Sequence, residues 1–161
     1  MNEQQEFGAP WGRLLKGMSG GVVLLFIGIA VAGKGDYIMM VLFPLILLTA
    51  APYMVRGYVV DGNELLIKRL GWITKFPLDD LQSVEVDPHA VKGSIRTFGN
   101  GGLFSFTGRY YSKTLGHYRA FVNDWKKTVV LRFEKRTILV SPDDPAAFVE
   151  SVKERCPQVH L

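Results

Sequence analysis

The chain has 161 residues, with 19 Lys or Arg against 15 Asp or Glu and a single cysteine, which excludes an intramolecular disulfide framework. The net charge of +4 is mild and the charges are interspersed, so nucleic acid is not an expected partner. No charged residue occurs in 17–33 or 37–55, whereas 16 of the 19 cations follow from Arg56 onward. This division predicts a membrane anchor joined to a domain that lies outside the bilayer.

Residues 1–13 are expected to form an N-terminal tail, and residues 14–55 a two-helix transmembrane hairpin. The two apolar segments, about 14–33 and 37–55, each approach the roughly 20 residues that a helix needs to cross the hydrocarbon. Because only three residues, 34–36, clearly separate the segments, we expect a tight antiparallel turn there.

Cations indicate the orientation of this hairpin. Arg13, Lys16 and Arg56 flank its outer ends, whereas its turn holds Lys34 beside Asp36. By the positive-inside rule, both termini and the domain that follows are expected on the cytoplasmic side of a multi-pass protein.

A cleaved signal peptide is the alternative interpretation of the first apolar segment. Its preceding cations, its apolar run and Ala30-Val31-Ala32 fit a cleavage site before Gly33. Cleavage there would leave only residues 33–36 before the next apolar segment, which would be an odd start for a mature protein. The uncleaved hairpin is therefore favoured.

Small residues recur on one face of the first segment, at Gly17, Gly21, Gly28 and Ala32. Such a stripe lets the second segment, or a second copy of the chain, approach closely, so a homo-oligomer is one expected partner. The general abundance of glycine in membrane helices explains the same stripe equally well.

Residues 56–161 alternate short apolar runs with turn residues, which is typical of an antiparallel β sandwich or barrel. The segment between residues 88 and 117 shows no clear pattern and is expected to be irregular. In one strand, Val129, Leu131 and Phe133 share a face and are predicted to be buried. The expected strands lie at residues 58–60, 65–67, 72–76, 81–86, 117–122, 127–133 and 137–140.

A helix is expected over residues 144–156, at the end of the β domain. A preceding aspartate can cap it, and Pro145 suits its first position. Phe148, Val152 and Cys156 then lie on one face, which we expect to cover an open end of the barrel and to meet the strand core.

The order of these motifs resembles the bacterial membrane-anchored pleckstrin-homology (PH-like) domains over about residues 56–156. The resemblance implies an inner-membrane protein of a bacterium and brings no known catalytic residue. The expected fold is a membrane helical hairpin plus a mainly-β PH-like split barrel or sandwich closed by a C-terminal α-helix. The motifs are YVVDGNEL at 58–65, FPLDDL at 76–81, RTFGNGGLF at 96–104 and SPDDPAAF at 141–148.

No catalytic residue, metal site or cofactor is expected. The glycine-rich run lacks the Gly-Lys-Ser/Thr ending of a phosphate-binding loop, and no G-x-S-x-G motif occurs. The three histidines are scattered and the single cysteine adds no cluster, so the chain is predicted not to be an enzyme.

Two basic regions are candidates for binding. One is a glycine-rich connection framed by two arginines, expected to act as a loop that contacts a partner or flanks a concave anion site. The other is a pair of cations on an early hairpin. Backbone shape and a solvated hairpin face are the simpler interpretations of these residues. The candidate residues are Arg96, Gly99, Gly101, Gly102, Arg109, Lys68 and Arg69.

The expected function is a membrane-anchored, non-enzymatic binding module that recruits or senses a partner at the cytoplasmic face of the bacterial inner membrane. The expected partners are the lipid bilayer, an unidentified protein, an anionic lipid or a second copy of the chain. A structural or self-assembling membrane component is the alternative. A concave basic pocket would favour ligand binding, whereas an exposed apolar patch or a free strand edge would favour assembly.

Overall fold

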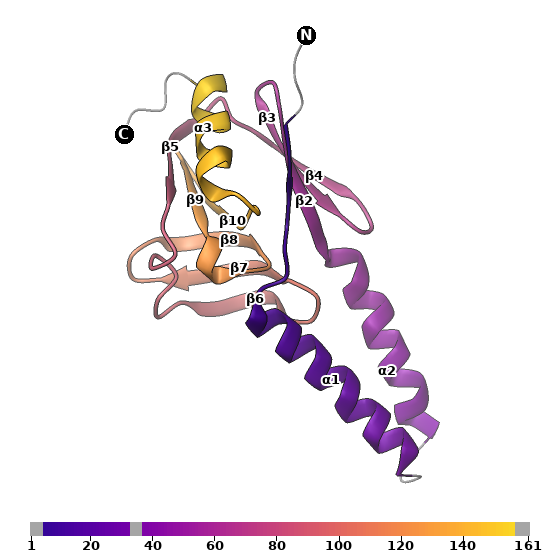
Figure 1. The fold of residues 1–161 in the computed structure, drawn as a ribbon. Coiled ribbons are helices and arrows are strands. Elements are labelled where there is room, and N and C mark those ends of the chain that lie inside the picture. Colours follow the sequence, from indigo (N-terminus) through magenta and orange to yellow (C-terminus); the bar gives the residue numbers. More distant parts are fainter. Residues whose placement is uncertain (1–4, 33–36, 157–161) are drawn as a thin grey trace.

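A computed structural model describes residues 5–32 and 37–156, and the turn expected at residues 34–36 lies outside them (Figure 1). Two helices, α1 (Arg13–Val31) and α2 (Tyr37–Ala50), project together from a β domain that carries the third helix. The remaining elements are β1 (Gln5–Gly8), η1 (Ala51–Tyr53), β2 (Val55–Asp61), β3 (Glu64–Arg69), β4 (Ile73–Pro77), β5 (Leu81–Val86), β6 (Ile95–Gly101), β7 (Phe106–Ser112), β8 (Gly116–Val122), η2 (Trp125–Lys127), β9 (Val129–Phe133), β10 (Thr137–Val140) and α3 (Pro145–Arg155).

Two sheets make up the β domain. The first has the strand order β1-β2-β3-β4, and the second the order β5-β9-β10-β8-β7-β6. Neighbouring strands are antiparallel except β8 and β10, which run parallel. A mainly-β domain with a C-terminal helix was predicted and is confirmed.

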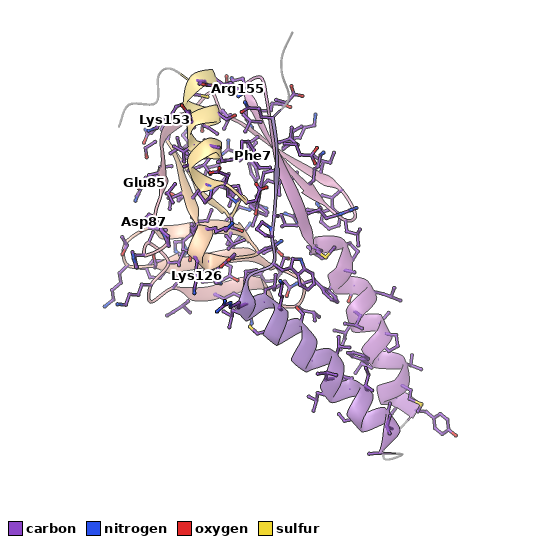
Figure 2. All side chains as sticks on the ribbon, in the orientation of Figure 1. Phe7, Glu85, Asp87, Lys126, Lys153 and Arg155 are labelled. Carbon is purple, nitrogen blue, oxygen red and sulfur yellow. The ribbon has the colours of Figure 1, made fainter. Side chains whose placement is uncertain are left out.

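Strand β1 precedes α1 in the chain, yet it pairs with β2, the first strand after α2. These residues were expected to belong to an N-terminal tail, because four residues carry too little periodicity to indicate a strand. The ring of Phe7 packs edge-on against Phe148 of α3, with 5.2 Å between the ring centres (Figure 2). The chain on both sides of the helical pair therefore belongs to one sheet.

Every strand predicted from periodicity is present, although β9 begins only at Val129 because the preceding residues form η2. Besides β1, two strands were missed. Strands β6 and β7 occupy the segment that was expected to be irregular, so the residues from Arg96 to Arg109 form a β-hairpin rather than a connecting loop. Glycine is depleted in strands, and this segment is rich in it, which hid the pairing.

The main core lies between the two sheets and beneath α3. Phe148 and Val152 are fully buried in it together with Leu131, and Phe133 is 4% exposed. The predicted packing of the helix on the strand core is confirmed. The helix starts as expected, since the Asp144 side chain accepts a hydrogen bond from a backbone N–H of its first turn.

A second core covers the opposite face of the six-stranded sheet. It contains Leu15 of α1, which is fully buried, together with Phe106, Tyr110 and Tyr118. Trp125 packs against this cluster from η2. The first turns of α1 are therefore part of the β domain.

A buried amide ties the chain on both sides of the two helices. Asn123 Nδ2 donates to the carbonyl oxygens of Ala9, at 2.9 Å, and Val55, at 2.8 Å. The Gly12 N–H in turn donates to the Asn123 carbonyl at 3.1 Å. A Cβ at Gly12 would lie 2.8 Å from the Asp124 carboxyl carbon, so this close approach requires glycine. The points where the chain leaves and re-enters the β domain are thereby fixed.

Replacing Asn123 with alanine tests this tie. The change leaves two buried carbonyls without a donor, and we expect the free energy of unfolding to fall by about 2–4 kcal/mol. Denaturant unfolding of the full chain in detergent micelles measures the loss. Gln82→Ala, which removes an exposed side-chain amide in β5, is the control and should cost less than about 1 kcal/mol. An equal, small loss for both variants would contradict the role given to Asn123.

The helix closure is tested by Phe148→Ala. Removing a fully buried phenyl ring leaves a cavity among both sheets, so we expect a loss of about 3–5 kcal/mol in unfolding free energy. Glu154→Ala, at an exposed position of the same helix, should stay within about 0.5 kcal/mol. A cost below about 1 kcal/mol for Phe148→Ala would show that α3 does not close the core.

Candidate functional site

A pocket of about 740 Å³ lies where the β domain meets α2. Strands β6, β7 and β8 form its floor, the end of β3 forms one wall, and α2 with η1 forms the other. Three arginines, Arg69, Arg109 and Arg119, line it, and we name it the arginine pocket after them. Ile46 and Tyr53 face it from the helical side.

Strand register explains why these side chains meet. Phe98 of β6 pairs with Arg109 of β7, and Arg109 pairs with Arg119 of β8. Partners directly across a sheet share a face, as do residues two apart in one strand, so Phe121 joins them. Arg69 ends β3 and approaches the same face from the other sheet.

Aromatic rings hold two of the guanidinium groups. The central carbon of Arg69 lies 4.8 Å from the centre of the Phe121 ring and 5.2 Å from that of Trp72. Arg119 lies 5.5 Å from the same Phe121 ring. The Nε of Arg69 is buried and has no hydrogen-bond partner in the described part of the chain. Cation–π contacts therefore help to position both groups.

The pocket concentrates positive charge. Burial lowers the pKa of the Arg69 guanidinium, and the charge of Arg119 lowers it further. Burial and then the charge of Arg109 lower the pKa of Arg119. None of the four ion pairs found within the described residues includes any of these three arginines. Because like charges directly across a sheet destabilise it, this arrangement suits an anion.

Three residues predicted as binding candidates, Arg69, Gly99 and Arg109, thus lie together in one pocket. Arg119, which also lines this pocket, was not among the predicted candidates. Its signal was a cation two residues before Phe121 in a largely apolar strand. Strand β7, which places Arg109 opposite this cation, was not predicted.

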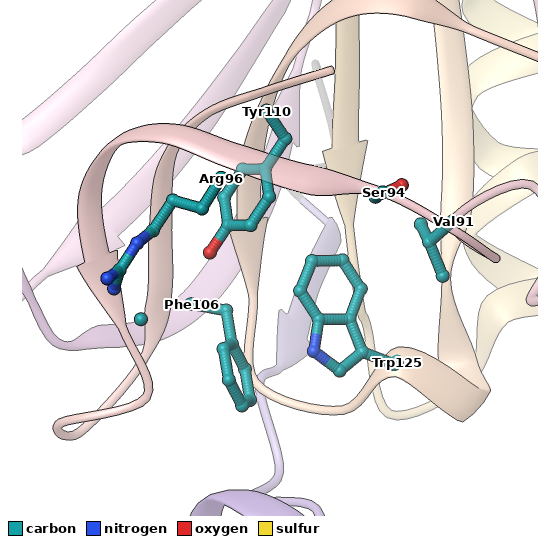
Figure 3. Close-up of a pocket in the computed structure, with 7 residues that line it drawn as sticks. Val91, Ser94, Arg96, Phe106, Tyr110 and Trp125 are labelled. Atoms are coloured by element: carbon teal, nitrogen blue, oxygen red, sulfur yellow. The ribbon is translucent and has the colours of Figure 1, made fainter. Parts of the chain in front are cut away.

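Arg96 and Gly101 lie on the opposite face of the hairpin. They line a smaller pocket of about 480 Å³, where Tyr110 and Trp125 also lie (Figure 3). The Arg96 guanidinium occupies the space where a side chain at Gly101 would start. Burial raises the pKa of Tyr110 to about 12, against the lowering effect of Arg96. Arg96 and Arg109 therefore do not frame one site.

Gly102 lies in the turn between β6 and β7, and this turn contacts α1 and η1. Ser19 of α1 donates to the Gly102 carbonyl at 3.1 Å and accepts from the Phe104 N–H at 3.0 Å. Ser105 donates to the carbonyl of Tyr53, in η1, at 3.1 Å. Gly102 has a φ of 119°, which favours glycine. Its role in the structure is to shape this contact.

Lys68 has a structural partner. Its ammonium group lies 2.7 Å from a carboxylate oxygen of Glu6, which joins β3 to β1 across the sheet. Neighbouring residues of a strand point to opposite faces, so Lys68 projects away from the face that Arg69 reaches. The structure does not place Lys68 in the arginine pocket.

Metal-ligating side chains are dispersed. Within residues 5–32 and 37–156, no three His, Cys, Asp or Glu side chains gather to hold a metal ion. Cys156 is buried below α3, and burial raises the pKa of its thiol. The chemistry that the arginine pocket offers is that of guanidinium donors.

Comparison with known families decides the class of the β domain. A family model described as the Bacterial PH domain matches residues 56–156, which is more than half of the chain. The chain belongs to the bacterial PH domain family. PH domains are generally binding modules without catalysis. No match is found among curated proteins or among solved structures.

Replacing Arg109 with glutamine tests the charge repulsion in this PH domain. The change removes one of two like charges that face each other across β7 and β8, so the free energy of unfolding should rise by about 0.2–1 kcal/mol. Unfolding at low salt in detergent measures it, and the gain should shrink at high salt. Lys113→Gln, at an exposed position just after the same strand, is the control. A loss of stability in Arg109→Gln at low salt would contradict the repulsion.

Proposed function

We propose that this protein is a membrane-anchored, non-enzymatic binding module. In this proposal α1 and α2 insert into the cytoplasmic membrane, and the PH domain lies against its inner face. The observation that carries the proposal is the apolar surface that both helices expose. α1 is long and apolar enough to cross a membrane, and only 11% of its most apolar window is buried.

The exposed side chains of both helices are large and apolar. Leu24 and Val31 of α1 are 69% and 81% exposed, and Val41 and Leu48 of α2 are 70% and 71% exposed. The two helices contact each other through the stacked rings of Phe26 and Phe43. Other side chains of both helices project outward and are uncovered (Figure 2). Water makes such a continuous apolar surface costly, whereas lipid hydrocarbon accommodates it.

Pairing of β1 with β2 constrains the topology. These strands flank the two helices in the chain, so a membrane that holds the helices must have both strands on one side. The pairing also supports retention of the first segment, since cleavage before Gly33 would remove β1 and the core residue Phe7. Arg13, Lys16 and Arg56 lie at the base of the helices and favour the cytoplasmic side for the PH domain.

The second helix is shorter than the sequence suggested. An apolar helix over about residues 37–55 was expected, but α2 ends at Ala50 and β2 begins at Val55. Fourteen helical residues span about 21 Å, against about 28 Å for α1 and about 30 Å of hydrocarbon. The proposed insertion therefore involves local thinning of the bilayer around the hairpin.

Self-assembly is the second candidate function, favoured by the free edge of β6, where Ile95 and Phe98 are 67% and 76% exposed. A bulge interrupts the pairing of this strand between Arg96 and Phe98, and bulges commonly protect edges from pairing with another chain. The stripe of small residues on α1 is also not covered by α2, since a Cβ at Gly17 or Gly28 would meet nothing within 4 Å among the described residues. No contact between copies of the chain is described at this stripe. The binding module is the better supported function.

Cysteine labelling in intact cells tests the orientation. A reagent that cannot cross the membrane should label a cysteine substituted at Gly35 and miss one substituted at Asn63, because the PH domain is proposed to be cytoplasmic. Permeabilised cells provide the control and should show labelling at Asn63. Cys156 is buried, and the unsubstituted protein reports any background. The reverse pattern would overturn the orientation, and a mature N-terminus at Gly33 would overturn the hairpin.

A further inference from the structure

The arginine pocket gathers three cations around a space that no carboxylate of the described residues neutralises. Arg109 and Arg119 face each other across two strands, and Arg69 reaches the same space from the second sheet. Each of the ion pairs in the described chain involves other cations. Arg109 and Arg119 are exposed along this space, so their unpaired positive charges attract an anion that enters it.

The donors suit a phosphate group. Arginine presents a planar fork of N–H groups that binds phosphate oxygens in pairs. The guanidinium groups of Arg69 and Arg119 both lie over the Phe121 ring, 4.8 and 5.5 Å from its centre, and this contact helps to position them. Arg109 and Arg119 are exposed along the pocket, so their N–H groups are accessible to a phosphate there.

The other side of the pocket is apolar and belongs to the helices. Ile46 and Ala50 of α2 line it, followed by Tyr53 of η1. Phe98 lines the same cavity from β6 with 76% of its surface exposed. A ligand that fills this space therefore meets guanidinium groups at one end and hydrocarbon side chains at the other.

We propose that the arginine pocket binds the phosphate group of an anionic phospholipid, with an acyl chain lying along Ile46 of α2 and Phe98 of β6. This inference rests on the proposed membrane anchoring, because insertion of α2 brings the pocket level with the lipid headgroups. Bound lipid would relieve the repulsion between Arg109 and Arg119. It would also hold the PH domain against membranes that are rich in anionic lipid.

Native mass spectrometry of the full chain in detergent tests the proposal. The probes are phosphatidylglycerol, which is anionic, and phosphatidylcholine, which is zwitterionic. We expect the unsubstituted protein to bind phosphatidylglycerol about tenfold more tightly or better, as one charge-assisted contact provides. The double variant Arg109→Gln with Arg119→Gln should lose this preference. Lys92→Gln with Lys113→Gln, which removes two charges outside the pocket lining, should keep it.

Two further comparisons distinguish a lipid phosphate from a soluble phosphate, and a failure of lipid binding from a failure of membrane anchoring. Glycerol 1-phosphate, which lacks acyl chains, should fail to displace phosphatidylglycerol at equal concentration. Displacement by it would overturn the lipid assignment in favour of a soluble anion. Retained preference in the arginine variant, or equal loss in the lysine control, would overturn the site. Binding in detergent does not depend on insertion in cells, so the labelling experiment reports a failure of membrane anchoring separately.

Discussion

The pairing of β1 with β2 is the constraint on which the rest of the structure depends. It brings together two chain segments that are separated by both apolar helices, and Asn123 fastens the two ends with one side-chain amide. Because Leu15 is fully buried in the second core, α1 leaves the β domain in a fixed direction. The helices are thus extensions of the PH domain rather than a flexible tether (Figure 1).

The β6–β7 hairpin extends this constraint to the candidate site. Its turn forms hydrogen bonds with Ser19 of α1 and with the Tyr53 carbonyl of η1, the short helix that follows α2. The hairpin is therefore held between the start of α1 and the segment that joins α2 to β2. That position puts Arg109 beside α2 and opposite Arg119. Repulsion between these two like charges lowers the stability of the fold. Binding sites commonly carry such a local loss of stability.

The elements whose structure depends on neighbouring residues in the chain were predicted correctly from the sequence. The alternation around Leu131 and the capped, amphipathic α3 were read correctly because each depends on neighbouring residues. Strand β1 was missed because its partner lies beyond two helices. The hairpin containing Gly99 and Gly108 was missed because glycine lowers strand propensity, whereas here two glycines face each other and let the strands approach closely.

The candidate site was predicted in fragments for the same reason. Arg69, Gly99 and Arg109 were singled out from their residue types, but grouping Arg109 with Arg96 assumed a loop. In a strand, side-chain direction follows register, and register placed those two arginines on opposite faces. A cation within the apolar strand β8 marks Arg119 in its own segment, but only the pairing with Arg109 of β7 assigns it to the pocket.

The central claim is that α1 and α2 lie in lipid as a unit fixed to the PH domain. Spin labels at the exposed positions Leu25 and Leu48, with Asn63 as the water-facing control, test it in reconstituted bilayers. Collision rates measured by electron paramagnetic resonance should favour oxygen over a water-soluble paramagnetic reagent at both helix positions, and show the reverse at Asn63. Equal access of the water-soluble reagent to all three positions would contradict the account.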